Sequence, residues 1–288
     1  MEECRYYRKI DDGTVECRLC PHHCRIAEGR AGQCKSRVNR GGTLFSEVYG
    51  CPCALAVDPV EKKPLYHFHP GSTCLSMACT GCNLRCLNCQ NNDISQAKPS
   101  DVPSYQLSPS QLVEICKQEG CPGLAYTYTE PLTYIEYVID TARIAHEQGL
   151  WNILVTAGFV EKEPLADLLP YIDAANIDLK SFSEDIYRRV SGGMLEVVLD
   201  TILAMRTAGV WIELTNLLIP GVNDDMEMVR QMCRWIVDNG MADVPLHFSR
   251  FFPRYKMKDV PPTPVRTLHA ARDVALEEGI KTVHLGNV

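Results

Sequence analysis

Cysteine is distributed very unevenly along this chain of 288 residues. Twelve of its 15 cysteines lie between Cys4 and Cys89, and only Cys116, Cys121 and Cys233 follow. The start of the chain is charged and polar, unlike the basic start and apolar run of a secretory signal. Because disulfides are rare in the reducing cytosol, such crowding is typical of metal or iron–sulfur chemistry. The sequence therefore predicts a cytoplasmic protein organised around metal-bound thiolates.

The charge balance and the apolar runs argue against two classes of partner, although a local basic patch stays possible. The chain has 29 Lys and Arg against 36 Asp and Glu, a net charge of −7, whereas nucleic-acid binding needs a surplus of basic residues. The longest apolar stretches, such as Leu214–Val222, are too short and too broken by Asn and Pro to cross a bilayer. We expect no nucleic-acid partner and no membrane association.

Short β-rich runs alternate with amphipathic helical patterns from residue 72 onward. Seven runs are strand candidates: Thr73–Ala78, Leu124–Tyr128, Asn152–Thr156, Ala175–Leu179, Trp211–Leu218, Pro245–Arg250 and Thr282–Leu285. Most are continuously apolar, as is typical of parallel strands buried on both faces. Strand–helix–strand units favour a parallel α/β barrel or an open sheet. Because residues 72–288 hold only six or seven units, the sequence predicts a partial (β/α)6 parallel barrel.

Two further patterns refine this organisation. Residues 1–71 are rich in Gly and Cys and contain no helical pattern longer than two turns, so we expect a small metal- or cluster-binding module there and the barrel in residues 72–288. Within the barrel, Ser108 precedes Pro109, and Gln111 follows three residues after the serine. This spacing predicts a helix that begins with a capping box.

A loop with three closely spaced cysteines follows the first predicted barrel strand. Cys82, Cys86 and Cys89 are separated by three and by two residues, so one short loop can place three thiolates at three corners of a [4Fe-4S] cube. Three ligands leave one iron open to a small molecule that carries an amine and a carboxylate. The loop also lies at the carboxyl end of a strand, where α/β barrels have their active sites.

Two other interpretations of this loop remain open at this point. A structural zinc site usually takes four ligands in two pairs, and an electron-transfer cluster needs a fourth thiolate. Cys79 is the nearest additional cysteine, and as a local fourth ligand it would close the cluster. The number of ligands in the loop therefore distinguishes an open iron from a closed one.

With this loop after the first strand, the sequence resembles the radical SAM superfamily, whose signature is C-x3-C-x2-C at this place in a partial (β/α)6 barrel. The resemblance implies that Cys82, Cys86 and Cys89 bind a [4Fe-4S] cluster and that S-adenosylmethionine (SAM) binds the open iron. It also implies that an electron from the reduced cluster cleaves SAM to methionine and a 5′-deoxyadenosyl radical, which abstracts hydrogen from a substrate.

Motifs along nearly the whole chain resemble the AmmeMemoRadiSam system radical SAM enzymes, which are relatives of the pyruvate formate-lyase activating enzymes. These motifs are Cys17–Cys24 (CRLCPHHC), Lys63–Phe68 (KPLYHF), Ala125–Pro131 (AYTYTEP), Asn176–Lys180 (NIDLK) and Ile219–Asp224 (IPGVND). The resemblance implies an oxidoreductase with a flavodoxin- or ferredoxin-type electron donor and a substrate glycine in a partner protein. A small-molecule substrate, or a non-catalytic iron–sulfur protein for electron transfer or scaffolding, are the alternatives.

The resemblance also implies cofactor contacts. Glu130 follows the second strand, where superfamily members carry a Gly-Gly-Glu motif that holds the methionine amino group. Thr156 ends the third strand in a turn like those that contact the cofactor, Asn88 stands where an aromatic residue usually contacts adenine, and Asn216 is a further candidate on the fifth strand. The structural alternatives are a helix N-terminus favoured by the charge of Glu130, and ordinary strand-end packing of Thr156.

Asp178 and Lys180 close the fourth strand, where side chains two residues apart point to the same face. In the activating-enzyme relatives an Asp-x-Lys at this place reaches the cofactor, so the resemblance implies a catalytic role for this pair. A solvent-exposed ion pair that contributes under about 1 kcal/mol is the alternative. His247 and Arg250 on the sixth strand are weaker candidates, because a histidine in an apolar strand is more often a core residue.

A second metal site is expected in the N-terminal region. Cys17, Cys20, Cys24 and Cys34 supply four thiolates, enough to close around zinc or around a second iron–sulfur cluster. The softness of the ligands does not decide between zinc and an iron–sulfur cluster, since zinc and iron–sulfur iron both prefer thiolate. If the cysteines were reduced and unmetallated, this region with few apolar residues would have no obvious source of stability.

Overall fold

The computed structural model describes all 288 residues, and its main sheet has eight strands. The strands are β7 (Pro52–Pro59), β8 (Thr73–Cys79), β9 (Gly123–Tyr126), β10 (Trp151–Thr156), β11 (Ala174–Asp178), β12 (Trp211–Leu218), β13 (Leu246–Arg250) and β14 (Val283–Gly286). They lie side by side in chain order, and β8 to β14 are parallel. The edge strands β7 and β14 do not pair with each other, so the predicted partial barrel is confirmed.

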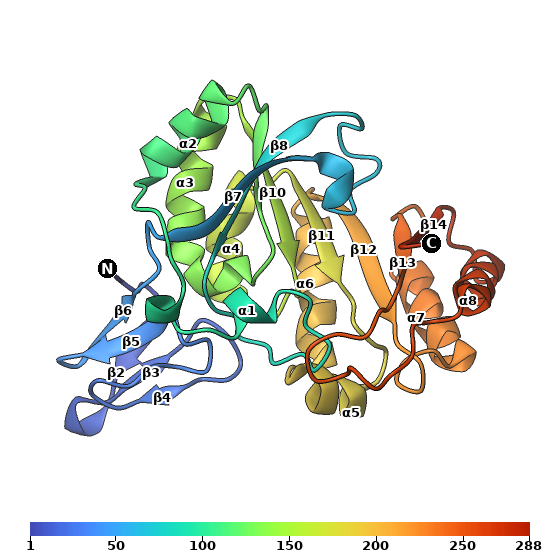
Figure 1. The fold of residues 1–288 in the computed structure, drawn as a ribbon, viewed down its shortest axis with the longest axis horizontal. Helices are drawn as coiled ribbons and strands as arrows, with labels where there is room; N and C mark the ends of the chain where they lie inside the picture. The colour runs from blue at the N-terminus through green and yellow to red at the C-terminus, as the bar shows by residue number, and fades with distance from the viewer.

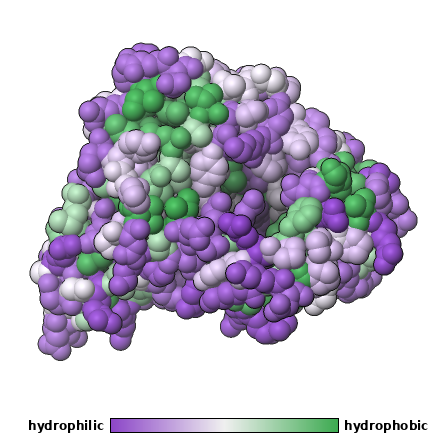
Figure 2. Space-filling view, viewed as in Figure 1, coloured by the Kyte–Doolittle hydropathy of each residue, from purple (hydrophilic) through white to green (hydrophobic).

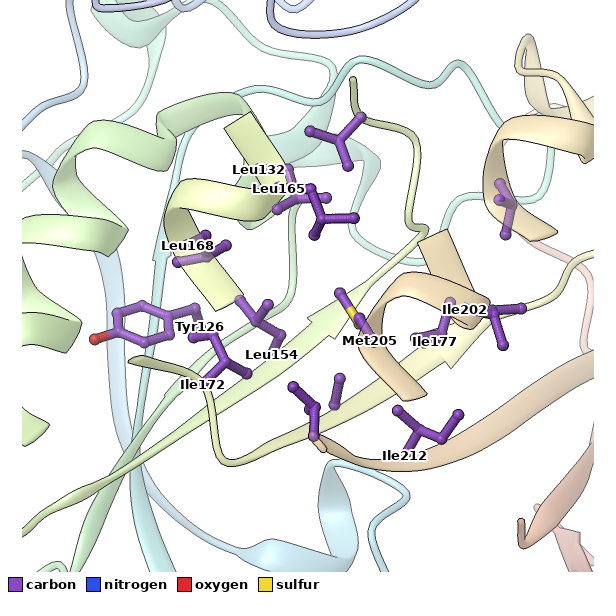
Figure 3. Packing of buried hydrophobic residues seen from close by; sticks show 14 of the residues in the cluster. Tyr126, Leu132, Leu154, Leu165, Leu168, Ile172, Ile177, Ile202, Met205 and Ile212 are labelled. Atoms are coloured by element: carbon purple, nitrogen blue, oxygen red, sulfur yellow. The ribbon is translucent and has the colours of Figure 1, made fainter. Parts of the chain in front are cut away.

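Helices connect the parallel strands. The longer ones are α2 (Pro109–Gln118), α3 (Ile135–Glu147), α4 (Lys162–Leu168), α6 (Leu195–Thr207), α7 (Met226–Asp238) and α8 (Val265–Glu277), and the short ones are α1 (Asn92–Ser95) and α5 (Glu184–Ile186). Buried side chains from β9 to β12 pack against α4, α6 and the turn before α3 (Figure 3). This packing fixes the strands, and with them the loops that follow their carboxyl ends. No helix is both long and apolar enough to span a membrane.

The N-terminal residues form two small antiparallel sheets. One has the order β1 (Glu2–Glu3), β6 (Thr43–Ser46), β5 (Arg37–Arg40), and the other has the order β2 (Tyr7–Lys9), β3 (Val15–Cys17), β4 (Arg25–Ile26). Figure 1 shows them at one end of the molecule, with β14 at the other. The predicted division at residue 71 stays a prediction, but β7 lies on its N-terminal side and nevertheless pairs with β8 in the main sheet.

Two features differ from the sequence-based expectations. The antiparallel strand β7 was not expected, because the segment from Pro52 to Pro59 adjoins Cys51 and belongs to the predicted cysteine-rich module. The predicted strand Leu124–Tyr128 ends at Tyr126, and Tyr128 has a φ of 64°, in the left-handed region. A strand cannot continue through a residue with this backbone conformation.

The capping box of α2 is confirmed and carries a first prediction. The Ser108 hydroxyl accepts a hydrogen bond from the Gln111 N–H at 3.3 Å, and the Gln111 side chain accepts one from the Ser108 N–H at 2.8 Å. Ser108→Ala removes one acceptor, so we expect the free energy of unfolding to fall by about 1 kcal/mol. Urea denaturation measures this loss, and the exposed Ser100→Ala is the control. An unchanged midpoint for Ser108→Ala would contradict the role of the cap.

Candidate active site

The three cysteines of the loop after β8 lie apart from the other thiols of the barrel. Cys82, Cys86 and Cys89 are each half-buried, whereas Cys79 is fully buried at the end of β8. Cys82 and Cys86 pack beside a small cluster around Leu84, while Cys79 belongs to the main core. The loop therefore presents three thiols together, and Cys79 is not among them.

Neighbouring segments hold this loop in place. The backbone N–H of Arg85 donates to the carbonyl of Ser191 at 2.8 Å, and that of Leu87 donates to Val190 at 2.9 Å. On the other side, the Gln96 side-chain amide donates to the carbonyl of Leu84 at 3.1 Å. The path of the loop is thus set by the turn after α5 and by the end of α1, and not by the loop alone.

The surroundings of the three thiols fit an iron–sulfur cluster. Burial raises the pKa of both the Cys82 and the Cys86 thiol, while Lys180 lies near enough to favour the Cys86 thiolate. Iron bound to sulfur releases the thiol proton and offsets the cost of burying the thiolate. No three His, Cys, Asp or Glu side chains, here or elsewhere in the chain, are arranged as the shell of a single metal ion. A [4Fe-4S] cluster does not need this arrangement, because each of the three cysteines binds a different iron.

Glu130 is buried beside the loop, with hydrogen bonds from two neighbouring segments. One carboxylate oxygen accepts from the Thr156 hydroxyl at 2.6 Å and from the Leu132 N–H at 3.2 Å, and the other accepts from the Ala157 N–H at 2.8 Å. Burial raises the pKa of this carboxyl, and these hydrogen bonds offset part of the increase. Glu130 caps the turn before α3, as its structural alternative required, and also lies beside Cys82 and Thr156.

Asp178 and Lys180 meet at the carboxyl end of β11. The Lys180 ammonium lies 2.8 Å from the Asp178 carboxylate, and their side chains are 25% and 40% exposed. The Lys180 backbone N–H donates to the Tyr187 hydroxyl at 3.0 Å, which fixes the turn. Burial opposes the lysine charge, but Asp178 and Cys86 outweigh it, so the pKa of Lys180 is raised. A permanent positive charge therefore lies beside the cysteine loop.

The remaining predicted cofactor contacts lie at the same edge of the sheet. Asn216 on β12 is buried and donates to the carbonyl of Leu179 at 2.6 Å, while its own side-chain oxygen has no partner. Asn88 is half-buried between the second and third loop cysteines. A buried oxygen without a donor is costly, so the Asn216 oxygen is available to a ligand.

His247 is a buried residue that contacts a buried carboxylate. Its Nε2 lies 2.7 Å from the buried Glu213 carboxylate, which also accepts from the backbone N–H groups of Tyr66 and His67 at 3.0 and 2.8 Å. Glu213 thereby ties the segment after β7 to the amino ends of β12 and β13. The motif Lys63–Phe68 was noted in the sequence, but nothing in its residue pattern indicated that its backbone binds Glu213.

A second group that sequence reasoning missed lies inside the barrel. The Asp58 carboxylate accepts a hydrogen bond from the Tyr128 hydroxyl and pairs with the fully buried Lys63 ammonium at 2.7 Å. The carbonyl of Tyr128 accepts from the Asn91 side chain at 2.7 Å, just beyond Cys89. Tyr128 thus links the barrel interior to the cysteine loop, and its left-handed backbone turns the side chain toward Asp58. The available signal was that Tyr128 and Thr129 precede Glu130 where the resembling superfamily motif has two glycines.

The four N-terminal cysteines, predicted as a second site, line one small cavity next to the loop. Cys17 and Cys24 come from β3 and the turn before β4, Cys20 lies between them, and Cys34 precedes β5. The structure thus places the four cysteines around one cavity, and their binding of a metal stays a prediction.

This geometry defines a class: an α/β partial barrel with a three-cysteine loop after its first parallel strand. The chain belongs to the radical SAM superfamily, which residues 78–233 match. Membership implies a [4Fe-4S] cluster and SAM as cofactors.

Known relatives agree with this assignment. An uncharacterized protein of Methanocaldococcus jannaschii is 47% identical over this whole chain and 86% of its own. The pyruvate formate-lyase 1-activating enzyme of Escherichia coli K12 is 24% identical over 70% of this chain and 88% of its own. Among solved structures, Streptococcus suis SuiB bound to SAM superposes with a TM-score of 0.56 at 10% identity, over 74% of this chain and 51% of SuiB. The chain therefore spans about half of SuiB, and that likeness shows the fold.

Proposed function

We propose that this protein abstracts a hydrogen atom from a residue of a partner protein, in the manner of glycyl-radical activating enzymes, and that it is an AmmeMemoRadiSam system enzyme. The observation that carries the proposal is the set of three half-buried cysteines beside Glu130, in a chain similar to most of the pyruvate formate-lyase activating enzyme. Its reaction needs one electron for each SAM, for which we propose a cytoplasmic flavodoxin- or ferredoxin-type donor.

The proposed roles of the side chains follow from their surroundings. Cys82, Cys86 and Cys89 hold the cluster, and Glu130, Thr156, Asn88 and Asn216 bind SAM. When bound, SAM and the cluster supply a 5′-deoxyadenosyl radical. Glu130 favours a cationic amine because its carboxylate is buried and offers acceptor oxygens, whereas the unpaired oxygen of Asn216 accepts a ligand donor.

We assign Asp178 and Lys180 a catalytic role through charge. The Lys180 ammonium stabilises negative charge at the cluster thiolates, and Asp178 holds it in position at 2.8 Å. A fixed positive charge near a cluster makes the added electron less costly, because reduction increases the negative charge.

Lys180→Met is expected to lower the rate of 5′-deoxyadenosine formation about 10–100-fold, the usual effect of losing a partner just outside the ligands. The cluster's reduction potential is expected to fall, since the nearby positive charge is gone. Potentiometric titration followed by electron paramagnetic resonance measures this shift, and Lys180→Arg should restore it. Lys162→Met is the control, because this lysine is 86% exposed and pairs only with Asp200. An unmoved potential would leave Lys180 a purely structural residue.

Two features favour a large substrate. The sheet is open between β7 and β14, and Phe252, in the loop after β13, is 49% exposed beside the carboxyl edge. In the orientation of Figure 1, the molecular surface is hollowed near its centre, and many of the residues around the hollow are hydrophilic (Figure 2). An exposed apolar side chain such as Phe252 is suited to contact a protein surface.

The test uses deuterium transfer to 5′-deoxyadenosine. The reduced holoenzyme is mixed anaerobically with SAM and the macromolecular fraction of source cells grown on α-deuterated glycine. Mass spectrometry is expected to show deuterium in 5′-deoxyadenosine. Turnover stimulated by the small-molecule fraction alone would overturn the proposal in favour of a small substrate. Stimulation by macromolecules without deuterium transfer would retain a protein substrate but exclude glycine. A cluster signal unchanged by SAM would support the electron-transfer or scaffold alternative.

A further inference from the structure

The four N-terminal cysteines line a cavity in which two buried polar side chains have an atom without a hydrogen-bond partner. Two side chains of the wall are buried with an unpartnered atom: one terminal nitrogen of Arg37 and the side-chain oxygen of Asn83. Their residues are 1% and 2% exposed. A buried guanidinium nitrogen without an acceptor costs free energy, so its presence beside four thiols indicates a missing negative charge.

We propose that Cys17, Cys20, Cys24 and Cys34 bind one thiophilic divalent cation of the zinc class, with Arg37 as its counter-charge. A divalent ion held by four thiolates carries a net charge of about −2, which a guanidinium partly neutralises. The space between the four cysteines is narrow, which favours a single ion over a four-iron cube. This site is separate from Cys82, Cys86 and Cys89 and does not depend on the radical reaction.

The surroundings of the sulfur atoms suit thiolates. The Gln33 N–H points at the Cys24 sulfur at 3.5 Å, and the Ser36 hydroxyl at the Cys34 sulfur at 3.4 Å. Gly32 lies against the Cys24 sulfur, since a Cβ at this residue would be in ordinary contact with that sulfur at 3.7 Å. No three of the four sulfur atoms are arranged as the shell of a metal ion in this structure, so metal binding requires their side chains to rotate toward one another.

The proposed centre adjoins the iron–sulfur loop at two points. A Cβ on Gly81 would lie 2.5 Å from the carbonyl oxygen of Cys34, so these two backbones are in close contact. The His22 ring lies 2.8 Å from the carbonyl of Asn83, and Cys20 packs in the same cluster as Leu84. The ion therefore stabilises the surface on which the radical-cluster loop rests.

The test separates the two metal sites. A full-length variant with Cys82, Cys86 and Cys89 replaced by alanine cannot hold the loop cluster. We expect it to retain one zinc ion per chain by plasma mass spectrometry. When it is refolded with Co²⁺, we expect the intense near-ultraviolet sulfur-to-cobalt band of a tetrathiolate site. Adding Cys34→Ser should abolish stoichiometric zinc and weaken this band, whereas adding Cys233→Ser, a buried cysteine of α7, should change neither.

Two results would overturn the proposal. One is the absence of stoichiometric zinc together with the absence of the cobalt band in the triple variant. The other is about four irons and four sulfides per chain in that variant, which would assign the cysteines to a second iron–sulfur cluster. If Cys34→Ser does not fold, the cobalt spectrum of the triple variant decides, because its intensity reports the number of thiolate ligands.

Discussion

Replacing Cys86 by alanine is expected to abolish SAM cleavage and to remove most of the iron bound at the loop. With two thiolates left, the loop cannot hold three corners of a cube. The loss should exceed the roughly 10–100-fold effect of changing an outer-shell partner. Iron analysis after anaerobic reconstitution and chromatography of 5′-deoxyadenosine measure the two effects.

Cys79→Ala is the matched control for this experiment. Cys79 is only three residues from Cys82, but it is fully buried in the main core and apart from the loop thiols. The variant should keep the cluster and the reaction, and lose only some stability. Loss of the cluster from Cys79→Ala, or its retention in Cys86→Ala, would contradict the assignment of three loop ligands.

Glu136→Gln is expected to produce the largest loss of stability among single conservative changes. Arg37 on β5 and Glu136 on α3 form an ion pair in which both side chains are 1% exposed. Burial opposes the charge of Arg37, but Glu136 outweighs it and keeps the pKa of the guanidinium above its usual range. In the metal-free protein, removing the carboxylate charge leaves the buried Arg37 cation without its partner, at a cost of about 3–5 kcal/mol. Guanidinium chloride denaturation measures this change.

Two variants show whether the effect comes from the buried charge. Asp185→Asn makes the same kind of change in an exposed pair with Arg189, and should cost under about 0.5 kcal/mol. In the metal-free protein, the double variant Arg37→Met with Glu136→Met should recover most of the lost stability, because neither charge of the buried pair remains. Equal losses in Glu136→Gln and Asp185→Asn would show that burial of the pair is unimportant.

Local sequence patterns predicted the parallel part of the fold well. The seven expected strands correspond to β8–β14, because buried parallel strands are continuous apolar runs. The capping box of Ser108 and Gln111 was equally local. The strand β7 was missed, since an antiparallel edge strand beside a cysteine-rich segment has no distinctive period. The strand β9 ends before Tyr128, whose backbone is left-handed and whose side chain bonds Asp58, a residue 70 positions away.

In the candidate site, the spacing in the sequence identified the three loop cysteines. Several of the residues that surround these cysteines lie far from them in the sequence, and only the structure showed their contacts. Glu130 was a candidate from its place after a strand, but its bonds to Thr156 and Ala157 depend on the pairing of neighbouring segments. The ligand roles of these residues remain predictions.

The sequence by itself determined the alternation of strands and helices, the cysteine loop and the four-cysteine set, because each is written in residues close together along the chain. Only the tertiary structure decided that Arg37 meets Glu136, 99 residues away, and that Asn83 of the loop lines the cavity of the N-terminal cysteines. Such contacts depend on strand order and on how the N-terminal sheets pack against α3. Strand order and sheet packing cannot be predicted from a local sequence period, since both depend on the burial of apolar surface across the whole chain.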